Sequence, residues 1–168
     1  MHMIASRRLA ALVVAGALAI SACGDDGDDT AAAGSAGNGP AAVPNPCELL
    51  NPDELAFVLG RRPGRATPSA YDPEQRRICT YGSGVIVALE IAENYDTAIE
   101  VARDESGEDS VSEVSGVGEG AVWQEVGDGS GWFMALGDEY FVGVLMPGGH
   151  QGRGQAIAAL ALIALAER

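Results

Sequence analysis

The sequence predicts an α+β domain in which one antiparallel sheet of about four to six strands carries helices mainly on one face. Three observations lead to this prediction. A helix start signal stands at Asn51, several short strand patterns separated by glycine turns follow, and an apolar helical run ends the chain. We expect a single globular domain with one disulfide over residues 46–168.

The first predicted helix lies between Asn51 and Gly60. Asn51 can cap it, Pro52 suits its first position, and Gly60 can end it in the left-handed conformation. Its predicted buried stripe consists of Leu55, Val58 and Leu59.

Two strand patterns and a second helix come next. One strand is expected around Arg77–Tyr81, and the residues 84–91 alternate in polarity. In that second strand Glu90 falls on the face away from the apolar side chains, so we expect it to face solvent. The second helix is predicted from Asp96, as its cap, to about Asp104.

Three closely spaced strands are predicted over residues 121–126, 131–136 and 139–146, joined by hairpin turns at 127–130 and 137–138. Alternation places Trp132, Met134 and Leu136 on one face and Phe133 on the other. Aromatic side chains left on an uncovered sheet face would form a binding surface. The last helix, residues 155–166, is apolar nearly all round and is therefore expected to be buried against the sheet, a second membrane contact being the alternative.

The N-terminal 22 residues are predicted to be a lipoprotein signal peptide. Arg7 and Arg8 precede a short apolar run, which ends in the tetrapeptide Ile20-Ser21-Ala22-Cys23. This tetrapeptide resembles a bacterial lipobox, in which the cysteine becomes the lipid-bearing N-terminus. The alternative is a general signal peptidase site with Cys23 incidental.

Residues 23–45 are expected to be the lipidated cysteine and a disordered acidic, Gly/Ala/Pro-rich tether, because the segment holds too little apolar surface to fold. Its four aspartates lack the spacing of a calcium loop. After cleavage the chain carries 8 arginines, no lysine and 24 carboxylates. Nucleic acid is therefore excluded as a partner, and acyl chains rather than the protein surface must supply affinity for the membrane.

Cys47 and Cys79 are the two cysteines left in the body of the chain. An exported protein folds in an oxidising compartment, so an even pair predicts one disulfide, which would link the opening helix to the sheet. A metal or redox pair is the alternative, but neither cysteine lies in a CxxC motif or beside a histidine.

Candidate chemistry is sparse. Residues 116–121 fit a loose dinucleotide-binding pattern but run into a strand, so a tight glycine turn is the better interpretation. Residues 148–154 form a glycine-rich segment before a helix, where Arg153 and backbone N–H groups could hold an anion, although a mobile connection is expected. His150 is the single histidine after residue 22, and it is predicted to be an exposed loop residue.

Five arginines are concentrated in residues 61–77. If they converged, they would form a positive patch for an anion or an acidic partner; we favour the alternative, in which they complement a helix end and offset local acid. The five are Arg61, Arg62, Arg65, Arg76 and Arg77.

The motifs Cys23, Pro46-Cys47-Glu48-Leu49-Leu50, Cys79-Thr80-Tyr81 and Gly116–Ala121 together resemble an actinobacterial lipoprotein family of unknown function. A fainter likeness is to extracellular sensor domains of actinobacterial Ser/Thr kinases, which usually carry two disulfides. The resemblance implies only an envelope lipoprotein with no assigned reaction, and we expect neither a catalytic residue nor a cofactor.

The expected function is a non-catalytic binding or accessory module of the cell envelope, held by lipid at the outer face of the cytoplasmic membrane. Its partner would be an unknown envelope protein, polymer or lipid. The alternative is a carrier of a lipid or other apolar ligand between sheet and helices. An envelope hydrolase is a third, less favoured expectation.

Overall fold

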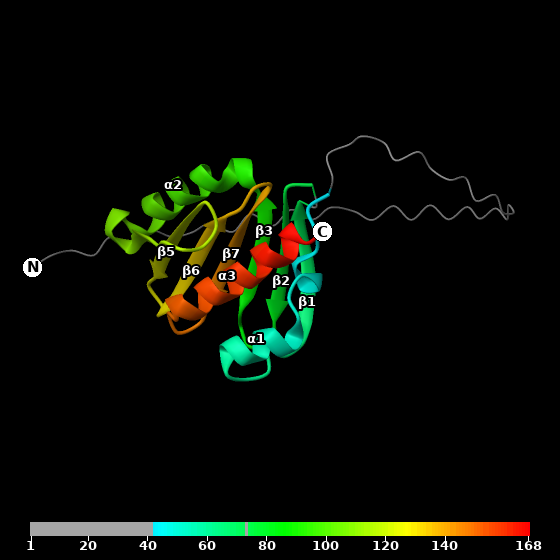
Figure 1. Cartoon of the computed structure of the whole chain (residues 1–168). Coiled ribbons are helices and arrows are strands. Elements are labelled where there is room, and N and C mark those ends of the chain that lie inside the picture. Colours follow the sequence, from blue (N-terminus) through cyan, green and yellow to red (C-terminus); the bar gives the residue numbers. More distant parts are fainter. Residues whose placement is uncertain (1–41, 73) are drawn as a thin grey trace, which may run out of the picture. The chain divides into compact units, whose positions relative to one another are not determined.

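The computed structural model describes residues 42–72 and 74–168 of the chain (Figure 1). The predicted signal peptide, Cys23 and most of the predicted tether lie outside the described residues. The elements, in chain order, are η1 Pro46–Glu48, α1 Pro52–Leu59, β1 Ala66–Asp72, β2 Arg76–Tyr81, β3 Ile86–Ile91, η2 Ala92–Asn94, α2 Tyr95–Ser106, η3 Glu108–Ser110, β4 Val111–Glu113, β5 Gly120–Val126, β6 Ser130–Leu136, β7 Tyr140–Met146 and α3 Gln151–Ala166.

The predicted α+β class is confirmed, with a sheet larger than expected. Seven antiparallel strands pair in the order β1-β2-β3-β7-β6-β5-β4. The two strands that sequence analysis missed, β1 and β4, are the edges of the sheet. β1 carries Pro68 and lacks apolar alternation, and β4 has only three residues, so neither edge strand has a clear strand pattern.

The first helix forms as its end signals predict. The side chain of Asn51 accepts a hydrogen bond from the Asp53 N–H at 2.9 Å, and Pro52 is the first helical residue. Gly60 ends α1 with a φ of 67°, a left-handed conformation that glycine adopts without strain. Leu55 and Leu59 are buried beneath the helix, so they anchor it to the core.

Two of the three α-helices in the described residues, α1 and α3, pack on one face of the sheet, in agreement with the expectation of helices mainly on one face, and α2 packs on the other. Val87, Phe133 and Val144 belong to one cluster with Leu55 of α1 and Ile157 of α3. The alternate residues of β5, β6 and β7 form a second cluster with α2, which consists of Tyr95, Ala102, Val122, Met134 and Phe141. We call the side under α1 and α3 the inner face of the sheet (Figure 1).

The helix α2 begins differently from the prediction. It starts at Tyr95, Asn94 occupies the cap position, and Asp96 lies in the first turn rather than at the cap. Gln124 of β5 is buried and donates from its amide to the Ala102 carbonyl oxygen at 3.3 Å and to Ser106 Oγ at 2.8 Å. These bonds tie the end of α2 to the sheet.

The helix α3 begins at Gln151, four residues before the predicted start. The predicted glycine-rich connection therefore divides, and its second half is the first turn of α3. Gly154 explains the close approach of helix and sheet, because a Cβ at this position would lie 2.9 Å from the Cβ of Phe133. The fold also begins earlier than Pro46, since Val43 is completely buried.

Candidate functional site

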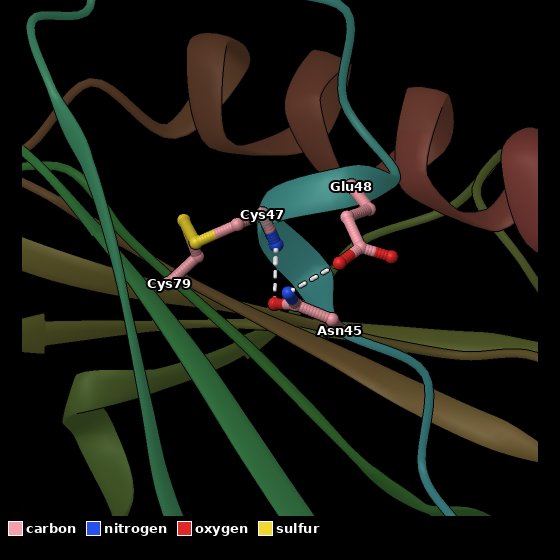
Figure 2. The surroundings of a disulfide bond; sticks show 4 residues. All are labelled: Asn45, Cys47, Glu48 and Cys79. Atoms are coloured by element: carbon pink, nitrogen blue, oxygen red, sulfur yellow. Dashed lines mark hydrogen bonds between the residues drawn. A yellow bond between two sulfur atoms is a disulfide. The ribbon is translucent and has the colours of Figure 1, made fainter.

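The predicted disulfide between Cys47 and Cys79 is present, with Cα atoms 5.1 Å apart (Figure 2). Cys79 is fully buried on the inner face of β2, and Cys47 lies in η1. Asn45 accepts from the Cys47 N–H at 3.1 Å and donates to Glu48 Oε1 at 2.8 Å. The disulfide and this cap together hold the segment that leads into α1 against the sheet.

The first three arginines of the predicted cluster lie beside the turn between β2 and β3. Arg61, Arg62 and Arg65 are all exposed. Arg61 donates to the Ser83 carbonyl oxygen at 3.1 Å, and the Arg65 carbonyl oxygen accepts from the Gly82 N–H at 3.0 Å. This group therefore supports a turn.

The other two arginines lie at the opposite end of β2, about 17 Å away for five residues of extended chain. Arg76 approaches Glu90 with 3.6 Å between Nε and Oε2. Arg77 pairs in register with Leu89, so it faces the other side of the sheet. The five arginines do not form one patch.

Glu90 departs from the prediction that it faces solvent. Its side chain is only 18% exposed, and it accepts from Asn94 Nδ2 at 3.0 Å in addition to its contact with Arg76. Glu90 of β3 therefore links Arg76 of β2 to Asn94 of η2, which is a structural role.

The two glycine segments carry local structure. Gly116 and Gly118 have φ values of 87° and 60°, and β5 follows at Gly120, so the predicted tight turn into a strand is confirmed. His150 is exposed just before α3, as expected. Among the described residues, no group of three or more His, Cys, Asp or Glu side chains is arranged to hold a metal ion.

The most exposed apolar side chains indicate a different candidate site, between α1 and α3. Of the large hydrophobic residues in the described part of the chain, Phe57 is 88% exposed, Ile163 57% and Val101 48%. Phe57 and Ile163 border one shallow groove of about 610 Å³ between α1 and α3. We call it the α1–α3 groove; it is lined by Asp53, Glu54, Phe57, Val58, Ala156, Ala159, Leu160 and Ile163.

This groove exists because α3 has two apolar sides. Its inner side packs on β6 and β7, whereas Ala156, Ala159, Leu160 and Ile163 face α1 and the exterior. The prediction that the whole helix is buried against the sheet is therefore wrong for its outer side. The sequence signal was present, because apolar residues repeat at helical spacing on two sides, but only one sheet face is available to cover them.

A second hollow, of about 840 Å³, lies at the C-terminal end of α3. Pro44, the glycine turn at 116–118, the turn at 137–140 and Leu162 and Leu165 of α3 form its walls. Asp138, Glu139 and Arg168 are at this site as well. Ala159 and Ile163 border both hollows, so they belong to one side of α3. We call this second hollow the α3 end cavity.

The predicted aromatic face of the sheet is less open. Trp132, Ile86 and Leu145 lie on the face that α2 covers in part, and each is half-buried. The indole of Trp132 packs over Gly143, where a Cβ would lie 3.4 Å from its Cζ3 atom. None of these three side chains is among the exposed large hydrophobic residues, whereas Phe57 and Ile163 of the α1–α3 groove are.

Comparisons with known proteins leave the function open. No family model matches the chain, and a search of curated proteins finds no match. A solved Thermotoga maritima structure described as a GTP binding regulator is similar at 14% identity with a TM-score of 0.41, over 69% of this chain and 90% of that one. A likeness this distant supports no argument about function. No helix in the described part of the chain has the length and apolar character needed to span a bilayer.

Proposed function

We propose that this chain is a lipid-anchored extracytoplasmic lipoprotein whose domain is a non-catalytic binding module of the cell envelope. The observation that carries the binding role is the α1–α3 groove, where two of the most exposed large apolar side chains meet. Exposed apolar side chains that gather at one groove indicate a binding surface, whereas single scattered ones do not. The anchor rests on the lipobox at Cys23, and the likeness to actinobacterial lipoproteins agrees with it.

The anchor is tested by Cys23→Ala in cells that express the full chain. We expect the wild-type chain in the membrane fraction and the variant in the medium or the soluble envelope fraction. Metabolic labelling with a clickable palmitate should mark the wild-type chain alone. A variant that stays in the membrane fraction, or an unlabelled wild-type chain, contradicts lipid anchoring.

The binding role is tested by placing a photo-crosslinking residue at position 57 of the full chain in living cells. Position 101 on α2 is the matched control, because Val101 is also an exposed apolar helix residue but does not line the groove. We expect a discrete adduct from position 57 and none of the same mass from position 101. Absence of any adduct from position 57 contradicts the binding role.

The α3 end cavity supports a second candidate, a carrier of an apolar ligand. The interior between sheet and helices, where such a ligand was expected, is filled by fully buried side chains such as Leu89, Phe133 and Ile157. The cavity instead opens at the end of the sheet where β6 turns into β7. Native mass spectrometry of the processed chain should then show a co-purified ligand that Leu162→Trp removes by filling the cavity. An empty wild-type protein opposes this candidate.

A further inference from the structure

We propose that the α1–α3 groove binds an amphipathic helix with a basic polar side, carried by a partner protein. This inference rests on the proposed binding role and adds the chemistry of the partner. The partner's apolar side chains would lie against Phe57 and Ile163, and its basic side chains would lie at Asp53 and Glu54.

The shape of the groove suits a helix. The outer residues of α3 repeat at helical spacing, and Phe57 and Val58 of α1 form the opposite wall. α1 has eight residues and is therefore about 12 Å long, which matches two turns of a partner helix. Grooves between helices recognise apolar anchors at positions i, i+3 or i+4 and i+7 of such a partner.

The charge of the groove selects a basic partner. Asp53 and Glu54 in the first turn of α1 are exposed and line it, and none of the arginines within residues 42–72 and 74–168 does. The described residues carry 20 carboxylates and 8 arginines, so an acidic partner meets repulsion at long range as well. Lysine or arginine side chains beside the apolar anchors would be attracted to this rim.

The two ends of the groove differ in charge. Asp53 and Glu54 mark the N-terminal end of α1, whereas Arg153 approaches Gly60 just beyond its C-terminal end, with Nη2 4.0 Å from the position of a Cβ there. The basic residues of the partner are therefore expected at the Asp53 end.

The test uses the processed chain, residues 23–168 with Cys23→Ser, and fluorescent peptides of about 18 residues. One peptide has leucines at i, i+3, i+4 and i+7 and lysines on its polar side. The second has the same leucines with glutamates in place of lysines, and the third is a scrambled version of the first. Anisotropy titration should show the first binding about tenfold more tightly than either control.

Variants of the protein locate the binding. Phe57→Ser should weaken the basic helical peptide about tenfold, whereas the matched variant Val101→Ser should leave the affinity unchanged. The double variant Asp53→Asn/Glu54→Gln should weaken it less and flatten its dependence on salt. Circular dichroism melts of the variants should match the parent, since all of these side chains are exposed.

Several outcomes would overturn the inference. They are equal affinity for the scrambled or the acidic peptide, no effect of Phe57→Ser, a dimer in sedimentation that Phe57→Ser dissolves, and binding to phosphatidylcholine vesicles that Phe57→Ser abolishes. If no peptide binds while position 57 still gives a specific crosslink in cells, the partner chemistry is wrong and the binding role stands. If both fail, the binding role falls too.

Discussion

Both sides of α3 are apolar, but only one of them is buried against the sheet. On the inner side Gly154, Ile157, Ala158 and Ala161 are buried against β6 and β7. On the outer side Ala156, Ala159, Leu160 and Ile163 repeat the same spacing, shifted by two residues, and Ile163 remains 57% exposed. The difference lies in what stands opposite, because the sheet covers one side and only the short helix α1 borders the other. An apolar pattern therefore does not by itself distinguish core residues from exposed ones. On α3 the same pattern occurs on the side packed in the core and on the side that lines the groove.

Loss of the disulfide should have the largest effect on stability, because the bond fastens η1 to β2 on the inner face of the sheet. Cys47→Ser with Cys79→Ser should lower the free energy of unfolding by about 3–4 kcal/mol, since the closed loop spans 32 residues in sequence. Urea denaturation of the processed chain under non-reducing conditions measures this. Identical midpoints for the parent and the double variant would show that the bond contributes nothing to stability.

A matched pair of isoleucine truncations tests the comparison directly. Ile157→Ala removes a fully buried side chain and should cost about 3 kcal/mol. Ile163→Ala, six residues later in the same helix, should cost less than about 0.5 kcal/mol, because more than half of the side chain is already in water. Similar losses in stability for both variants would mean that the outer side is packed as firmly as the inner side.

A matched pair of glycines in the first turns of α3 gives a second test of the difference between the buried and the exposed side of the helix. Gly152→Ala meets no atom within 4 Å and should stabilise the helix by about 0.5–1 kcal/mol, because alanine restricts the unfolded chain more than glycine does. Gly154→Ala places a methyl group 2.9 Å from Phe133 Cβ and should instead destabilise the protein by about 1–3 kcal/mol. Thermal melts of the two variants should shift in opposite directions.

The sequence predicted most of the elements for local reasons. Asn51 and Gly60 bound α1, and the glycine turns separate the strands β5, β6 and β7, because caps and tight turns are encoded by a few adjacent residues. The edge strands were missed because an edge needs little apolar alternation. The sequence does not indicate which face α2 covers, since that depends on the register of distant strands.

The groove was beyond prediction for a related reason. Periodicity shows that Leu160 and Ile163 are apolar, but only the assembled fold shows that no further element covers them. The five arginines show the converse, because they lie close together in sequence but the length of β2 separates them in the fold. A site that depends on which surfaces remain uncovered becomes visible only when the layers are in place.

Substitution of Tyr81 should have the smallest effect on stability, and it tests whether water reaches the inner face of the sheet. It is 4% exposed, its hydroxyl has no hydrogen-bond partner among the described residues, and burial raises its pKa above the usual 10.0. Well below pH 10 the phenol is neutral in both states, so the ionisation of this group does not affect stability there. As pH rises above 10, the unfolded chain ionises first and stability falls. Tyr81→Phe should therefore change the free energy of unfolding at pH 8 by less than about 1 kcal/mol and should reduce the loss of stability between pH 8 and 10.5.

Part of that loss of stability should persist in the variant, because burial and then the charges of Asp96 and Glu113 raise the pKa of Tyr95 on the other face of the sheet. Urea titrations at the two pH values measure both, and an unchanged alkaline loss would show that the Tyr81 hydroxyl reaches water.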